Sequence, residues 1–126
     1  MANDSNQFSY FKVHSEYSIC EGAIKIDDLS KYCKDNKVKA IGMSDTSNLC
    51  GSLEFSEKIS KSKTQPIIGS QIKFKFNDII GSLPIIAKNS DGYKELINLS
   101  SKSFLENPDI NDPHCLIELL LSLIHI

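Results

Sequence analysis

Two side chains near the N-terminus have the types and positions that enzymes use for chemistry. The run Phe8–Val13 is rich in aromatic and β-branched residues, which favours a β-strand, and it ends directly before His14. A polar turn follows, and it carries the acid Glu21 just before Gly22. In α/β barrels the catalytic groups gather at the carboxyl ends of the strands. A histidine and a carboxylate in such a loop make this segment the first candidate for an active site.

The rest of the chain can be interpreted as further strand and helix units beside that first strand. Buried strands are indicated by short apolar runs, and helices by apolar residues that recur at helical spacing. Repeated strand-helix units predict parallel strands and a single α/β domain, although four strands are too few to close a barrel. Further strands are expected at 38–43, 66–76 and 83–87, and helices at 23–36, at about 50–62, after the cap at 89–92, and after Asp112-Pro113.

Apolar spacing also predicts which face of each element is buried. In the strand at 66–76, the apolar residues alternate with Lys73 and Lys75, so one face should be buried and the other wet. The loop at 44–48 offers Asp45 as a cap for the second helix, or else as a metal ligand or base. The expected buried positions are Ile72, Phe74 and Phe76 in the strand; Tyr93, Leu96, Ile97, Ser100 and Phe104 in the third helix; and Leu116, Leu119, Leu120 and Leu123 in the last.

Composition narrows the class of protein. The chain has 126 residues, 40% of them hydrophobic and 24% charged, which suits one globular domain or part of a larger one. The net charge of −2 gives no reason to expect a broad surface for nucleic acid. All 14 basic residues are lysines. Any contact with phosphate must therefore use lysine or backbone amides rather than a bidentate arginine.

The cysteines and the two ends of the chain exclude several other classes. Cys20, Cys33, Cys50 and Cys115 form no Cys-x-x-Cys pair, so neither a zinc site nor a disulfide framework is indicated. Cys20 and Cys50 could be reactive thiols, although buried packing cysteines are commoner. The N-terminus lacks the apolar core of a signal peptide, and the apolar run Leu116–Ile126 is too short to span a bilayer. We therefore expect a cytoplasmic protein.

Four phrases of the sequence carry a resemblance to a known family. They are, in order, KVHSEYSICEGAIKIDDL, KAIGMSDTSNLCGSLEF, QPIIGSQI and PIIAKNSDGYKELINLSSKS. Together they resemble the N-terminal polymerase-and-histidinol-phosphatase (PHP) domain of bacterial replicative DNA polymerase III alpha subunits, from about Tyr10 to about Ser103. The resemblance implies that residues 1–126 form a partial PHP domain, the first half of a distorted (β/α)7 barrel. The terminal LLSLIHI does not resemble the family, and residues 116–126 are interpreted as a truncated or mis-extended end.

The resemblance also implies a degenerate metal site. Metal-competent members hold a metal cluster with histidines and acids at strand ends, and such a cluster activates water for phosphoester hydrolysis. Here a lysine replaces the first histidine and is expected to supply a fixed positive charge in place of the ion. A hydrogen-bonded histidine and a solvated or lysine-paired acid are the preferred interpretations of the two retained ligands. We expect no metal and no catalytic residue at the vestigial positions Lys12, His14, Glu21, Thr46, Gln71 and Ser82.

In this family the catalytic carboxylates for polymerisation, and the Mg²⁺ that they hold, lie in a palm domain far downstream. The resemblance therefore implies a DNA-directed DNA polymerase as the parent protein, with this fragment as a scaffolding and interaction module that holds no cofactor. The implied partners are the remainder of the polymerase chain and the proofreading exonuclease subunit, with DNA reached only through the full-length protein and no membrane contact. One alternative is a metal-dependent PHP phosphoesterase, and another is a generic α/β domain.

Overall fold

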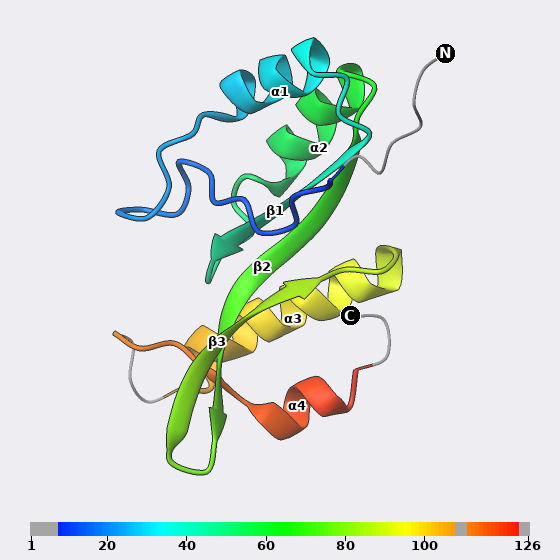
Figure 1. Ribbon diagram of the computed structural model, residues 1–126. Helices are drawn as coiled ribbons and strands as arrows, with labels where there is room; N and C mark the ends of the chain where they lie inside the picture. Colours follow the sequence, from blue (N-terminus) through cyan, green and yellow to red (C-terminus); the bar gives the residue numbers. More distant parts are fainter. Residues whose placement is uncertain (1–7, 108–110, 124–126) are drawn as a thin grey trace.

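The computed structural model describes residues 8–107 and 111–123, and one long β-strand runs through its centre. Strand β2 (Gln65–Phe76) pairs in parallel with β1 (Ala40–Thr46) along its first half and with the short β4 (Cys115–Leu116) near its end. Its other edge pairs antiparallel with β3 (Ile79–Ile86). The result is an open sheet of mixed strand direction in an α/β fold (Figure 1).

The hairpin between β2 and β3 corrects the expectation that all strands are parallel. Asn77 adopts a positive φ of 52°, which Asn tolerates and which a tight turn at this position requires. Because the turn is so short, β3 begins at Ile79, four residues before the predicted start of that strand at Leu83. The strand predicted at 66–76 is confirmed. The one predicted at 38–43 lies at 40–46 instead, so Asp45 is inside β1 rather than in the following loop.

The first predicted strand, Phe8–Val13, is not a regular strand. The segment does run beside β1, because Val13 bridges Met43 and the Gly42 amide donates to the carbonyl of Tyr10. The two residues between Tyr10 and Val13 bulge over β1, which breaks the ladder. A Cβ on Gly42 would lie 2.8 Å from the Phe11 Cα, so this close approach requires glycine.

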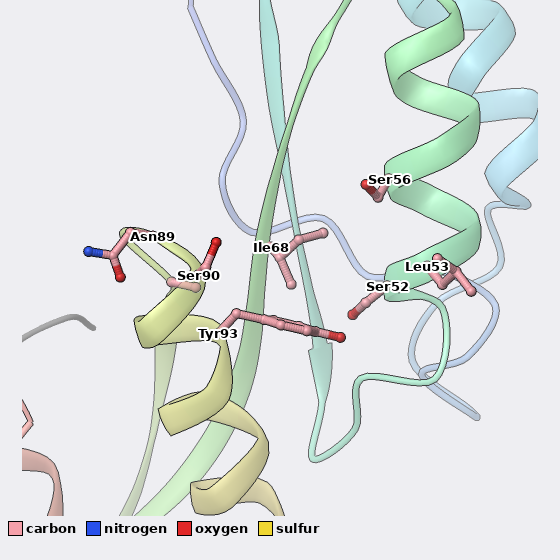
Figure 2. Close-up of a pocket in the computed structure, with 8 residues that line it drawn as sticks. Ser52, Leu53, Ser56, Ile68, Asn89, Ser90 and Tyr93 are labelled. Carbon is pink, nitrogen blue, oxygen red and sulfur yellow. The ribbon is translucent and has the colours of Figure 1, made fainter.

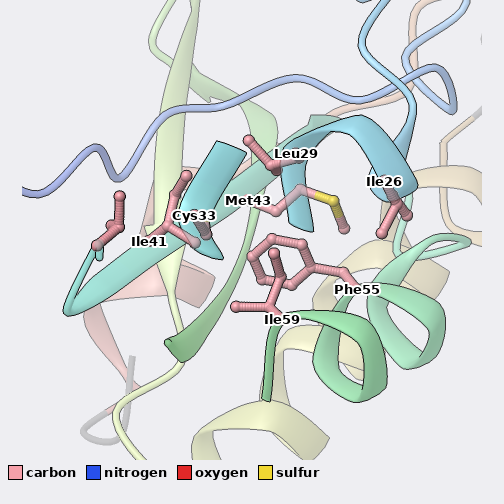
Figure 3. Close-up of a cluster of buried hydrophobic side chains, with 8 residues drawn as sticks. Ile26, Leu29, Cys33, Ile41, Met43, Phe55 and Ile59 are labelled. Atoms are coloured by element: carbon pink, nitrogen blue, oxygen red, sulfur yellow. The ribbon is translucent and has the colours of Figure 1, made fainter. Parts of the chain in front are cut away.

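Two helices cover the N-terminal half of the sheet and form the first core. Helix α1 (Ile26–Asp35) begins three residues later than predicted, and α2 (Ser52–Lys61) lies close to its predicted range. Both pack against the same face of β1, where Ile41 and Met43 alternate with residues of the opposite face (Figure 3). The buried residues of this core are Ile26, Leu29, Cys33, Val38, Ile41, Met43, Phe55 and Ile59.

A second core lies farther along β2, on the same face. Helix α3 (Ser90–Leu105) packs there, and its N-cap Asn89 accepts a hydrogen bond from the Gly92 amide, as the sequence predicted. The short α4 (Ile117–Leu121) lies beside it. No helix within the parts of the chain that the structure describes is long and apolar enough to cross a membrane. The buried residues of this second core are Ile72, Phe74, Ile85, Leu96, Leu99 and Cys115.

The predicted apolar faces need three corrections. In α3, Leu96, Leu99 and Ser103 are buried, whereas Ile97 and Phe104 are more than 40% exposed, so the buried face is rotated from the predicted one. The last helix starts only at Ile117, because the two residues before it pair with β2. Its apolar stripe is only partly buried, with Leu116 exposed. At the end of β2, Phe76 is exposed too.

Candidate functional site

The centre of the candidate site is the carboxylate of Asp45, which is fully buried near the C-terminal end of β1. Three neutral groups donate to it. The Ser15 amide lies 2.6 Å from Oδ1, the Ser15 hydroxyl 2.7 Å from Oδ2, and the Ser18 hydroxyl 2.8 Å from Oδ1. Donors to an ionised acceptor form stronger hydrogen bonds than neutral pairs do. The Asp45 carboxylate therefore ties the loop after the N-terminal segment to the sheet without any cation.

This loop is wound tightly enough to bring its serines to one point. The Ser18 amide donates to the Ser15 carbonyl, and the Gly22 amide donates to the Ser18 carbonyl. A Cβ on Gly22 would lie 2.2 Å from the Ser15 carbonyl oxygen, so no other residue fits without a shift of the backbone. Cys20 takes a positive φ of 67° in the same turn. In the pair Glu21-Gly22 noted in the sequence, the glycine is therefore required by the close approach of the Ser15 carbonyl.

The structure brings most of the vestigial ligand positions to one face of the sheet, opposite the helices. Thr46 and Gln71 are register partners across β1 and β2, and Lys73 and Ser82 are register partners across β2 and β3. Because side chains alternate along a strand, these four lie on the same face. The Thr46 hydroxyl donates to a carboxylate oxygen of Glu21. We call the set Glu21, Thr46 and Gln71 the rim.

His14 lies beside the rim and contacts the hydroxyl of Ser18, with 3.4 Å between Oγ and Nδ1. The single hydroxyl hydrogen of Ser18 points to Asp45, and the Thr46 amide donates to the same oxygen. A contact between Ser18 and His14 must then use a hydrogen on Nδ1 of the ring. This geometry fits the expected hydrogen-bonded histidine at a strand end.

Lys12 and Ser82 stand apart from the rim. Lys12 is exposed in the bulge beside β1 and forms no ion pair with any residue in 8–107 or 111–123. Ser82 is exposed on β3, two register positions beyond Gln71. Its partner Lys73 is paired with Asp112 instead, at 2.6 Å, and this lysine holds the pKa of the Asp112 carboxyl below its usual range. The predicted substitution of the ion by Lys12 stays a prediction.

Asp45 does not cap the second helix, and that prediction was wrong. The residue lies inside β1, and the N-cap of α2 is Gly51, which has no side chain to accept a hydrogen bond. Sequence reasoning also missed Ser15 and Ser18. One signal in the sequence could have found them. Asp45 follows a short apolar run typical of a buried strand, and a buried carboxylate needs several donors, which the serines of the turn after Val13 can supply.

The rim's donor set does not suit a metal cluster. Thr46 and Gln71 offer neutral oxygens, and Glu21 already accepts the threonine hydroxyl. In the described part of the chain, no three side chains of His, Cys, Asp or Glu are grouped so that they could hold a metal ion. One oxygen is nevertheless left over, because Oε1 of Gln71 is buried and has no hydrogen-bond partner among the described residues.

A second polar cluster holds the loop against α2. The Tyr17 hydroxyl donates to Glu54 at 2.7 Å, and Lys58 bridges Glu54 and Asp27 at 2.6 and 2.7 Å. Hydrogen bonds from Lys58 and then Tyr17 lower the pKa of Glu54, whereas the hydrogen bond to Glu54 raises the pKa of Tyr17. This cluster links the loop, α1 and α2, so its role is structural.

A hollow of about 370 Å³ lies between the N-terminal turns of α2 and α3 (Figure 2). Its walls carry the hydroxyls of Ser52, Ser56 and Ser90, together with Tyr93, and Ile68 of β2 forms the floor. The Ser52 hydroxyl is buried and has no hydrogen-bond partner among the described residues. The lining contains no charged side chain, and the hollow shares no residue with the rim.

The remaining candidates from the sequence lie away from the rim. Cys20 and Cys50 are both exposed, which corrects the expectation of buried packing cysteines for these two. His114 faces the Asp112 carbonyl and the Asn107 side chain, each at 2.8 Å. His125 lies outside the described residues.

Comparison with known proteins agrees with this fold. Residues 11–124 match the model of the PHP domain family. The DNA polymerase III alpha subunit of Rickettsia felis is 38% identical over 102 residues, which cover 80% of this chain and 8% of that protein. The Caulobacter vibrioides subunit is 34% identical over 119 residues, which cover 84% of this chain and 10% of the relative. This chain thus spans about a tenth of the length of these relatives.

A solved structure matches as well. A Bifidobacterium adolescentis protein, described as a metal-dependent phosphoesterase, superposes with a TM-score of 0.58 at 12% identity. The superposition covers 75% of this chain and 32% of that one. At such low identity the match supports the fold alone, as part of a PHP-like structure. Because the family model covers most of the sequence, the chain belongs to the PHP domain family and is homologous to the N-terminal part of DNA polymerase III alpha subunits.

Proposed function

We propose that this chain is the N-terminal, partial PHP domain of a replicative DNA polymerase III alpha subunit, and that it serves as a scaffold. The observation that carries the proposal is the match of about four-fifths of the chain to the corresponding part of such subunits. Polymerase catalysis and its Mg²⁺ would then belong to a palm domain outside these residues. The DNA sequence that follows the codon for Ser122 tests this. A frame that continues into a palm domain supports the proposal, and a stop codon in a sound read overturns it.

The scaffold role is supported by the rim. The loop that carries the metal ligands in this family is held here by the Asp45 carboxylate and two serines, which need no ion. The neutral groups at Thr46 and Gln71 weaken any metal site further. The phosphoesterase alternative requires a metal-activated water, and the donor set at the rim does not suit the metal.

Contacts with the rest of a polymerase chain are proposed for one face of the β2–β3 hairpin, the surface made by Phe76, Ile79 and Leu83, which the strand register places on the same side. These side chains are 58%, 71% and 43% exposed. Strand β3 pairs only with β2 within the described part of the chain, so its other edge is open as well. Open edges and exposed apolar side chains promote association. We therefore expect the isolated chain to be marginally stable or aggregation-prone.

A polar substitution distinguishes a contact surface from mere exposure. Leu83→Ser should make the isolated chain more soluble, because it removes exposed apolar surface. In the complete polymerase the same change should lower the melting temperature, because the side chain would be buried there. Leu53→Ser on α2 is the control, since Leu53 is 72% exposed and belongs to a helix that packs at the N-terminal half of the sheet, away from the hairpin. Equal effects of both substitutions in the complete protein would exclude the hairpin as the contact.

The proofreading exonuclease subunit is a second proposed partner. If both variants of the complete protein still retain that subunit, its contact lies elsewhere than on the hairpin.

A further inference from the structure

Five of the chain's 14 lysines surround one hollow, although the chain as a whole carries a net charge of −2. The hollow has a volume of about 440 Å³, and all five lysines are exposed. We call this the lysine hollow. Its lining is Lys34, Lys37, Val38, Lys39, Lys61, Ser62 and Lys63.

The lysine hollow lies at the opposite end of β1 from the rim. It is formed where α1 and α2 end and the chain turns into β1 and β2. Figure 1 shows the two helices side by side, both ending near the start of β2. A strand the length of β1 separates the two sites by about 20 Å at roughly 3.3 Å per residue. A ligand in the hollow would therefore not touch the rim.

The backbone around the hollow is fixed, so the lysines are presented together. Lys37 and Lys63 both adopt positive φ, at 51° and 60°, in the tight turns that follow the two helices. The Thr64 hydroxyl donates to the Val38 carbonyl at 2.8 Å, and the Gln65 amide donates to the Lys39 carbonyl at 2.9 Å. These two hydrogen bonds join one turn to the other. The five side chains thus extend from one connected frame.

The helix dipoles explain the positions of only some of the five lysines in the lysine hollow. Lys34 and Lys61 lie in the last turns of α1 and α2, where a positive charge favourably offsets the helix dipole. Lys37, Lys39 and Lys63 lie beyond the helices, so the dipoles do not account for them. Within residues 8–107 and 111–123, neither Lys34, Lys61 nor Lys63 forms an ion pair. The hollow therefore has positive charge to share with an external anion.

We propose that the lysine hollow binds the phosphodiester backbone of DNA. Clustered lysines bind phosphates through charge and the release of counterions, without arginine and without reading the bases. Protein interfaces are usually centred on buried aromatic or apolar anchors, and the only apolar residue of this lining, Val38, is 9% exposed. The proposal goes beyond a scaffold role, because it gives this chain its own DNA contact, and it does not depend on that role.

The test is binding of short fluorescein-labelled DNA, single-stranded and duplex, measured by anisotropy at low salt over a range of salt concentrations. The test variant carries Lys34→Gln, Lys61→Gln and Lys63→Gln. The control carries Lys25→Gln, Lys31→Gln and Lys88→Gln, which remove the same charge from exposed positions outside the hollow. Circular dichroism confirms that both variants are folded.

The test variant should bind DNA at least roughly tenfold more weakly than the control variant. On duplex DNA, the slope of log affinity against log salt concentration should be less steep by about 0.9 for each lost phosphate contact. The comparison of single-stranded with duplex DNA identifies which form the hollow takes. Equal weakening in both variants would overturn the proposal, because it would reflect net charge alone.

Lysine acetylation gives a measurement that needs no variant. DNA should protect Lys34, Lys37, Lys39, Lys61 and Lys63 of the unchanged chain from acetylation, while leaving Lys25, Lys31 and Lys88 reactive. Uniform protection, or tighter binding of a polyglutamate peptide than of DNA to the hollow, would also overturn the proposal.

Discussion

Removing the Asp45 side chain should destabilise the domain more than any other single change near the rim. Asp45→Ala leaves three buried donors without their acceptor, the Ser15 amide and the hydroxyls of Ser15 and Ser18. A buried donor left unsatisfied costs about 1–3 kcal/mol, and a serine hydroxyl can rotate to recover part of that cost. We expect a loss of about 3–5 kcal/mol in the free energy of unfolding.

The matched variant is Asp45→Asn, which keeps the shape of the side chain. Its amide oxygen can accept from the two donors that now share Oδ1, and its amide nitrogen can donate to the Ser15 hydroxyl after that hydroxyl rotates. The remaining loss is that of charge assistance, so we expect only about 1–2 kcal/mol.

Urea denaturation followed by circular dichroism measures both losses. The assay is run with and without EDTA, because a hidden metal would make the effect of Asp45→Ala depend on chelation. Two results would refute the reasoning about Asp45. One is a loss within about 1 kcal/mol for Asp45→Ala, which is less than the cost of a single orphaned donor. The other is a larger loss for Asp45→Asn than for Asp45→Ala.

Three further predictions concern the same loop and its surroundings. Gly22→Ala should destabilise the fold by about 2–4 kcal/mol in urea denaturation, because the added Cβ would lie 2.2 Å from a backbone oxygen. Gly81→Ala is the control and should change stability by less than about 1 kcal/mol, because its Cβ would have nothing within 4 Å. The pKa of Glu54 is lowered in the fold, so its stabilising contact is present above the unfolded pKa and is lost as pH falls through the folded pKa. The stability difference between wild type and Glu54→Gln should therefore be largest near neutral pH and shrink in acid, and a difference that grows in acid would contradict this. Cys20 and Cys50 should react with a thiol reagent in the native protein. Cys33 and Cys115, whose pKa values are raised by burial, should react only on unfolding. Equally fast reaction of all four thiols would contradict the burial of these two.

Local pattern predicted the elements well where one signal acted alone. The alternation in β2 and the Asn89 cap of α3 are both as expected, because each depends on neighbouring residues only. The register of α3 within the core was missed by one position, since its buried side is set by contact with Ile72 and Ile85. The bulge before Val13 was also missed, because it depends on the close approach to Gly42.

The candidate site was predicted as a set of positions but not as a set of contacts. Glu21 and Thr46 do meet, and Thr46 lies opposite Gln71. The role of Asp45 could not be predicted from spacing, because its donors are 27 and 30 residues away in the sequence. Hydrogen bonds between buried polar groups that are distant in the sequence can be identified only once the tertiary fold is known. In this chain those bonds hold the loop beside the rim in place.

The most direct test of the account is a calorimetric titration of the chain with Mn²⁺ and Zn²⁺, paired with melting temperatures. If the Asp45 network holds the rim without an ion, neither metal should bind stoichiometrically or raise the melting temperature. Stoichiometric binding that stabilises the wild type and disappears in His14→Ala would contradict the account and favour a metal-dependent phosphoesterase.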